Sequence, residues 1–218
     1  MLNRLETLGR IVRAGAVGII RASKNCDLPA IVEALWEGGL GVIEITATSP
    51  GAAAAIRQVC STLPDVLIGA GTVLDAASAN RMLDAGARFL VSPSTARDVL
   101  EVAQSTGAVA IPGALTPTEI VSAWQGGGDL IKVFPAASFG PAYIRALQGP
   151  LPDIPLAPTG GVDGENAGEY LSAGATVVCV GGWLAPKDAI LRGDYGLMKG
   201  RAESLVSAVA QYREGGLR

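Results

Sequence analysis

The sequence predicts one α/β domain in which eight parallel strands close into a (β/α)₈ barrel, a TIM barrel, with an extra N-terminal helix. Nearly continuous apolar segments alternate with segments of helical periodicity, and a glycine repeatedly precedes each new apolar segment. Three of these glycines, Gly86, Gly107 and Gly128, recur every 21 residues, as expected of a repeating βα unit. Strands that are apolar on both faces indicate a buried parallel sheet, and eight βα units favour closure over the alternative, an open flavodoxin-like sheet.

The expected strands follow from these signals in chain order. They cover residues 16–21, 42–47, 67–72, 89–93, 108–113, 130–135, 155–159 and 177–181. Helical spacing is clear between the first two, where Leu28, Ile31, Val32, Leu35 and Trp36 recur at i, i+3, i+4, i+7 and i+8. Helix starts are marked by a capping box at 116–119 and by the cap-proline pair Ser49-Pro50. Residues 1–218 are therefore expected to form a single domain.

The composition excludes several classes of protein. There are 17 basic and 20 acidic residues, giving a net charge of −3 without a run of like charge, so neither nucleic acid nor an anionic membrane is an expected partner. No apolar segment reaches the roughly 20 residues needed to span a bilayer, and no secretory signal stands at the N-terminus. We therefore expect a cytoplasmic protein.

The chain contains no histidine, which narrows the possible chemistry. Ser/His/Asp hydrolysis and histidine-ligated zinc are excluded in their usual forms. The three cysteines, Cys26, Cys60 and Cys179, are odd in number and widely spaced, so buried free thiols are expected rather than disulfides. Carboxylate, lysine, hydroxyl and backbone chemistry remain.

Two charged residues interrupt the apolar strands. Lys132 lies within Leu130–Phe134 and Glu44 within Val42–Ile45. Because side chains alternate along a strand, both point into the barrel if their apolar neighbours face the helices. A buried ion pair that merely fixes the interior is one interpretation. The other is catalytic, since burial favours the neutral form of an amine, which can attack a carbonyl.

The position of these two residues favours the catalytic interpretation. Both lie toward the carboxyl ends of their strands, where active sites of barrels of this kind are found. The other lysines, Lys24, Lys187 and Lys199, are in loop or helix contexts and are predicted to be solvated.

Glycine-rich strand ends predict an anion site. Gly160-Gly161 follows the seventh expected strand and Gly181-Gly182 the eighth, the usual phosphate position in a barrel. At the end of the third strand, residues 69–72 (Gly-Ala-Gly-Thr) offer N–H groups and a hydroxyl suited to a carboxylate. The alternative for each of these segments is a tight turn without a ligand.

Taken together, these motifs resemble one enzyme family in order and spacing over nearly the whole chain. They are Glu44-Ile45-Thr46, Gly69-Ala70-Gly71-Thr72-Val73, Ser92-Pro93, Ile111-Pro112-Gly113, Lys132-Val133-Phe134-Pro135-Ala136 and Pro158-Thr159-Gly160-Gly161-Val162. The chain is similar to 2-keto-3-deoxy-6-phosphogluconate aldolases, a family that includes 4-hydroxy-2-oxoglutarate and 2-keto-3-deoxy-6-phosphogalactonate aldolases. The resemblance implies a class I aldolase that uses neither a metal nor an organic cofactor and forms a homotrimer.

The resemblance also implies roles for individual residues. Lys132 matches the Schiff-base lysine and Glu44 the residue that shuttles protons. The phosphorylated keto acid and pyruvate are the expected ligands. The residues expected to bind them are Arg21, Thr48, Gly71, Thr72, Pro93, Phe134, Thr159, Gly160, Gly161, Gly181 and Gly182.

Departures from the family pattern leave the substrate open. Thr48 stands where phosphogluconate aldolases often carry an arginine, and Gly182 where the family has a serine. Residues 138–143 look more like the phosphogalactonate branch. Cleavage of a 2-keto-3-deoxy-6-phospho sugar acid to pyruvate and glyceraldehyde 3-phosphate is the expected reaction. The alternatives are cleavage of 4-hydroxy-2-oxoglutarate to pyruvate and glyoxylate, or a phosphate-binding barrel without catalysis.

Overall fold

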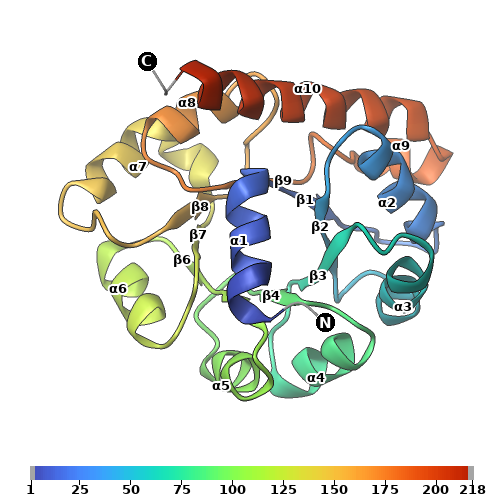
Figure 1. Cartoon of the computed structure of the whole chain (residues 1–218), viewed down its shortest axis with the longest axis horizontal. Coiled ribbons are helices and arrows are strands. Elements are labelled where there is room, and N and C mark those ends of the chain that lie inside the picture. Colours follow the sequence, from blue (N-terminus) through green and yellow to red (C-terminus); the bar gives the residue numbers. More distant parts are fainter. Residues whose placement is uncertain (1–2, 216–218) are drawn as a thin grey trace.

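A curled parallel sheet surrounded by helices forms the protein in the computed structural model, which describes residues 3–215 (Figure 1). Every strand pair is parallel. One run of strands has the order β5-β4-β3-β2-β1-β9 and the other the order β6-β7-β8. The strands are β1 (Ala16–Ile20), β2 (Val42–Thr46), β3 (Leu67–Gly71), β4 (Phe89–Val91), β5 (Val109–Ile111), β6 (Gly113–Ala114), β7 (Ile131–Val133), β8 (Leu156–Pro158) and β9 (Val178–Val180).

The segment expected as one strand over 108–113 is instead divided into β5 and β6 at Pro112. Proline has no N–H to donate to a strand ladder, so regular pairing stops there. The carbonyl of Pro112 still accepts the Lys132 N–H at 2.9 Å. The chain therefore passes from one run of the sheet to the other at this residue.

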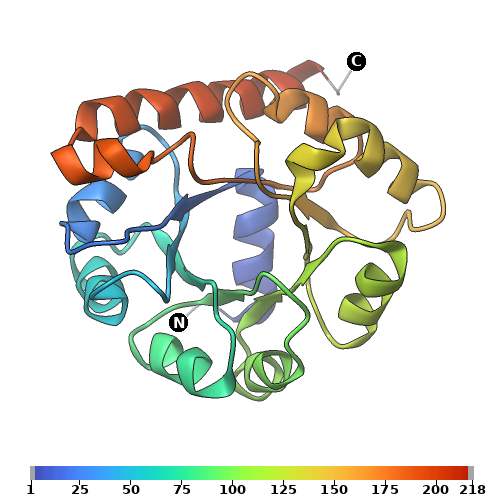
Figure 2. The same ribbon diagram turned by 180° about the vertical axis from the view of Figure 1, so that it is seen from behind.

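Helices cover the outside of the sheet, as both views show (Figure 2). They are α1 (Arg4–Ala14), α2 (Leu28–Glu37), α3 (Ala52–Thr62), α4 (Ala76–Asp84), α5 (Arg97–Thr106), α6 (Pro117–Gln125), the 3₁₀ turn η1 (Ala136–Ser138), α7 (Gly140–Gln148), α8 (Ala167–Ser172), α9 (Lys187–Arg192) and α10 (Tyr195–Gly215). None of the helices described between residues 3 and 215 is long and apolar enough to cross a membrane.

Of the two predicted helix starts, one is confirmed and one is wrong. The capping box between Thr116 and Glu119 is present at α6. Ser49 does not cap α3, which begins after Gly51 in a left-handed conformation with φ 76°. The Ser49 hydroxyl instead accepts the Ala22 N–H at 3.0 Å and lies 2.8 Å from the Thr46 hydroxyl. It thereby joins the loops that follow β1 and β2.

Side-chain alternation divides the core into two clusters. Ile43, Ile45, Ile131 and Val133 belong to the cluster that packs against the helices. The second cluster fills the interior of the curled sheet and includes Val42, Leu67, Phe89, Leu130 and Cys179. Because inward and outward positions alternate, Glu44 and Lys132 face the interior, which confirms the prediction for both.

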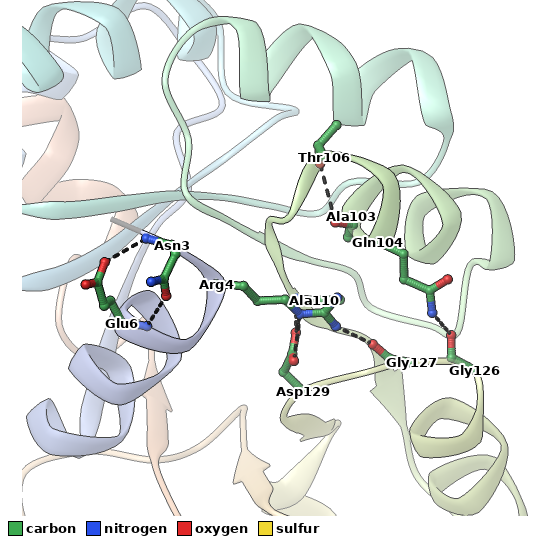
Figure 3. A network of polar contacts seen from close by, with 10 residues as sticks. All are labelled: Asn3, Arg4, Glu6, Ala103, Gln104, Thr106, Ala110, Gly126, Gly127 and Asp129. Atoms are coloured by element: carbon green, nitrogen blue, oxygen red, sulfur yellow. Dashed lines mark hydrogen bonds and ion pairs between the residues drawn. The ribbon is translucent and has the colours of Figure 1, made fainter. Parts of the chain in front are cut away.

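Helix α1 crosses the end of the interior at the amino ends of the strands (Figure 1). Its Ile11 is fully buried in the interior cluster. An ion pair fixes its first turn, since Arg4 Nε lies 2.9 Å from Asp129 Oδ1, and Asp129 also accepts the Ala110 N–H at 2.8 Å (Figure 3). The amino end of the sheet is therefore closed, and the opposite end is left for a ligand.

Candidate active site

A cavity of about 690 Å³ opens at the carboxyl ends of the strands. Most of the predicted site residues line it: Arg21, Thr72, Pro93, Lys132, Phe134, Thr159, Gly160, Gly161, Gly181 and Gly182. They come from strand ends far apart in the sequence, which the curled sheet brings together. The volume lies in the range of small-molecule sites.

Lys132 enters this cavity from the middle of β7. Its side chain is only 5% exposed. Its neighbours in the ladder are Gly113 and Ala157, two small residues that leave room for the long side chain. The Nζ atom lies 5.4 Å from the centre of the Phe134 ring, over the ring face. A buried lysine that reaches into a cavity is well placed to act as a nucleophile.

Glu44 is fully buried and, unlike Lys132, is not among the residues that line the cavity. Neither carboxylate oxygen has a hydrogen-bond partner within the described residues. Burial raises the pKa of Glu44, and the positive charges of Lys132 and Arg21 oppose that rise. A carboxyl group in this state is suited to exchange protons with a bound substrate.

Lys132 and Glu44 are not joined in a structural ion pair. Over residues 3–215, the pairs of oppositely charged groups within 4.0 Å do not include these two. The interpretation of a buried pair that merely fixes the interior is therefore wrong for this structure.

Gly71 was predicted to bind the substrate, but it does not line the cavity. A Cβ atom at Gly71 would lie 2.2 Å from Glu44 Oε1, far inside van der Waals contact. Two residues earlier, a Cβ at Gly69 would lie 2.4 Å from the Phe89 ring. Two of the three inward positions of β3 are therefore glycine, because the Glu44 carboxylate and the Phe89 ring occupy the space.

Thr72 adopts a left-handed conformation with φ 53°, which is strained for a β-branched residue. Arg21 Nη2 donates a hydrogen bond to the Thr72 hydroxyl at 2.9 Å. In the following turn, the buried Ser92 hydroxyl donates to the Val73 carbonyl at 2.7 Å. This end of the cavity presents a cation, a hydroxyl and a fixed turn, which suit a carboxylate.

Two glycine pairs, Gly160-Gly161 and Gly181-Gly182, also line the cavity. Gly160 and Gly161 have φ values of 92° and 72°, which glycine adopts without strain. Asn166 Nδ2 donates to the Gly161 carbonyl at 2.8 Å, and the Asp163 carboxylate accepts the Asn166 N–H at 2.9 Å, so the loop is held in place.

None of the backbone bonds outside the regular elements of residues 3–215 has Gly160, Gly161, Gly181 or Gly182 as its donor. Such N–H groups are suited to an anion.

The comparisons with known proteins agree with this geometry. A sequence model described as "KDPG and KHG aldolase" matches residues 9–199. A 2-dehydro-3-deoxy-phosphogluconate aldolase of Pseudomonas aeruginosa is 36% identical over 212 residues, covering 96% of this chain and 95% of the relative. The chain belongs to the KDPG and KHG aldolase family. It is a class I pyruvate aldolase, a carbon–carbon lyase. The alternative of a phosphate-binding barrel without catalysis is therefore wrong.

Two further relatives bear on substrate and mechanism. A probable 2-dehydro-3-deoxy-6-phosphogalactonate aldolase of Rhizobium meliloti is 38% identical over 160 residues, covering 72% of this chain and 76% of the relative. A KDPG aldolase structure from Legionella pneumophila, with pyruvate captured as a covalent carbinolamine, has a TM-score of 0.83 and 32% identity. It covers 91% of this chain and 97% of that one.

Sequence reasoning missed part of the aldolase cavity. Trp183 and Lys187, which follow Gly181-Gly182, also line it, although Lys187 was expected only to be solvated. Their contribution depends on how the loop after β9 folds back, which no local pattern indicates. Conversely, Thr48 is exposed and does not line the cavity, and its hydroxyl is 3.4 Å from that of Thr46.

The cysteines are free thiols, as predicted, but only Cys179 is buried. Cys60 is exposed and Cys26 is half-buried, which corrects the expectation of three buried thiols. Burial, with the Glu44 charge nearby, raises the pKa of Cys179 to about 12, so its thiol keeps its proton. In residues 3–215 no three Cys, Asp or Glu side chains gather where they could hold a metal ion.

Replacing Gly71 tests whether this glycine makes room for the carboxylate. We expect Gly71→Ala to displace Glu44 and lower kcat by about a hundredfold, a typical cost of a 1 Å misplacement. Gly41→Ala is the control, since nothing lies within 4 Å of a Cβ there. Glu44→Asp shortens the side chain and should restore part of the space. The double variant Gly71→Ala/Glu44→Asp should therefore lose less kcat than the product of the two single losses. Wild-type kcat in Gly71→Ala would show that the carboxylate position does not matter.

The buried carboxylate should cost stability at high pH. Because burial raises the pKa of folded Glu44, its penalty is absent below the ordinary value of about 4.5 and is present above the raised value. We therefore expect Glu44→Gln to melt at a higher temperature than the wild type at pH 8, with a difference that shrinks toward pH 4. Paired thermal denaturation across this range measures it. A difference in melting temperature that does not change with pH would contradict a raised pKa for Glu44.

Proposed function

We propose that the protein cleaves a 2-keto-3-deoxy-6-phospho sugar acid, of the gluconate or galactonate type, to pyruvate and glyceraldehyde 3-phosphate. The observation that carries this proposal is the buried Lys132 side chain in a cavity with a carboxylate-binding end and a glycine-amide end. The names of the relatives support both sugar types.

The covalent step begins at Lys132. Its neutral amine attacks the C2 ketone of the substrate to give a carbinolamine, which loses water to form an iminium ion. The iminium draws the electrons of the C3–C4 bond as the proton of the C4 hydroxyl is removed. Glyceraldehyde 3-phosphate leaves, and an enamine of pyruvate stays bound to Lys132.

Glu44 moves the protons in this proposal. Its carboxylate, directly or through one water, removes the C4 hydroxyl proton, and the resulting acid protonates C3 of the enamine. Water then hydrolyses the new iminium and releases pyruvate. The raised pKa of Glu44 supports both roles, because an acid with a raised pKa is also a stronger base after ionisation.

The remaining cavity residues bind the substrate. Arg21 and Thr72 are placed to hold the carboxylate, beside Pro93 and Phe134. The amides of the two glycine pairs and the buried Thr159 line the end that receives the phosphate. The substrate contact predicted for Thr48 has no support from the cavity lining, which does not include this residue. Gly71 does not line the cavity either, and we assign it the role of leaving room for Glu44.

We also propose that residues 1–218 form one domain in which the curled sheet closes into a complete (β/α)₈ barrel. A parallel bridge between Thr159 and Cys179 supports closure between β8 and β9. So does the Thr176 N–H, which donates to the Leu156 carbonyl at 2.9 Å. The proposal that the protein is a homotrimer rests on the family resemblance alone, and a native mass other than three times 22.1 kDa would refute it.

Cleavage of 4-hydroxy-2-oxoglutarate is the second candidate. The observation in its favour is the family model, whose description includes KHG (4-hydroxy-2-oxoglutarate) aldolase as well as KDPG aldolase. The exposed Thr48, which offers no cation where related enzymes often have an arginine, leaves this substrate possible. The same Lys132 and Glu44 chemistry would give pyruvate and glyoxylate. A higher kcat/KM on this substrate than on both phosphorylated acids would favour it.

Trapping with borohydride tests the Schiff base. We expect pyruvate and sodium borohydride to add a pyruvate-derived mass to the peptide that contains Lys132, because reduction fixes the iminium. Lys132→Ala should lose the adduct and several orders of magnitude in kcat, as when a nucleophile is removed. Lys199→Ala, which changes an exposed lysine, is the control and should keep both. Substantial turnover by Lys132→Ala would overturn the mechanism.

A further inference from the structure

Four charged side chains line the cavity, and three of them are already engaged. Arg21 donates to the Thr72 hydroxyl, and Lys132 is the proposed nucleophile. The Asp163 carboxylate accepts the N–H groups of Glu165 and Asn166 within its own loop, both at 2.9 Å. The fourth is Lys187. Its ammonium group forms no ion pair in the chain between residues 3 and 215.

The segment that carries Lys187 is held by several contacts. Within it, the Ala185 N–H donates to the Gly181 carbonyl at 2.9 Å, and Leu184 is fully buried. Arg201 of α10 donates to the carbonyl of Trp183 and lies over its ring, 5.3 Å from the centre. The loop therefore fixes the backbone that presents Lys187 to the cavity, on the side of the Gly181-Gly182 pair.

Lys187 is the cation that follows the Gly181-Gly182 pair in the chain and lines the same cavity. Glycine N–H groups supply dipoles, and Gly182 has no hydroxyl to add. A phosphate monoester carries about −1.5 to −2 charges near neutral pH. Lysine binds such groups as a flexible point charge, so the exposed Lys187 can reach a phosphate while its own backbone stays fixed.

We propose that Lys187 binds the terminal phosphate of the substrate and sets the preference for phosphorylated over unphosphorylated 2-keto-3-deoxy acids. This inference rests on the proposed function and adds a specificity-determining residue to it. Lys187 acts on binding alone, because the proposed covalent and proton-transfer steps take place at Lys132 and Glu44. Its removal should therefore raise KM and leave kcat unchanged.

The test compares Lys187→Gln with Lys199→Gln. Both variants remove one exposed lysine charge, but Lys199 pairs with Glu37 outside the cavity. For the 6-phospho sugar acid we expect Lys187→Gln to raise KM about tenfold, the loss expected from one charge-assisted contact. Its kcat/KM on the unphosphorylated acid should stay at the wild-type value. Lys187→Arg should keep KM within about threefold of wild type, and Lys199→Gln should change neither substrate.

Two results would overturn the role of Lys187 and leave the proposed function standing. They are a wild-type KM for the phosphorylated acid in Lys187→Gln, or an equal rise in KM for both acids while Lys132 still forms the pyruvate adduct. A wild-type protein that cleaves neither acid and forms no adduct on Lys132 would overturn the function itself. Measuring the adduct first in each variant separates these cases.

Discussion

The structure depends on keeping an unpartnered carboxylate inside a parallel sheet. Glu44 is fully buried and neither of its oxygens has a hydrogen-bond partner within residues 3–215. A group in this state costs free energy of folding, which the charges of Lys132 and Arg21 offset only in part. The apolar interior, closed by Ile11 of α1, must supply the rest. In the proposed mechanism Glu44 carries the protons, so folding stability is given up at the residue on which proton transfer depends.

Two inward-facing glycines of β3 leave the space that the interior side chains need. Gly69 leaves space for the Phe89 ring and Gly71 leaves space for Glu44. A slip of one residue in β2 would turn the charged side chain toward the helices and the isoleucines toward the cavity. The register that pairs Glu44 with Gly69 and Thr46 with Gly71 is therefore a condition of the chemistry as well as of the fold.

The sequence was informative where one residue breaks a pattern. Lys132 and Glu44 were placed correctly because a charge in an apolar strand must face something other than the helices. The division of a strand at Pro112 was visible in principle, since proline cannot donate to a ladder. The partner of Gly71 and the position of Lys187 were not visible, because both depend on contacts between loops or strands that only the folded chain brings together.

The two tasks of the site are carried by different parts of the fold. In the proposed mechanism, bond cleavage rests on Lys132 and Glu44, which lie within strands, whereas substrate recognition rests on loops beyond the strand ends. A substitution in a loop that lines the cavity, such as Gly182 for serine, can therefore change which acid binds while Lys132 and Glu44 stay in place. In the proposed mechanism this separation explains how a chain with altered loops keeps the strand motifs of its family, and why substrate preference is to be sought in the loops, among them the one after β9, rather than in the strands that carry Lys132 and Glu44.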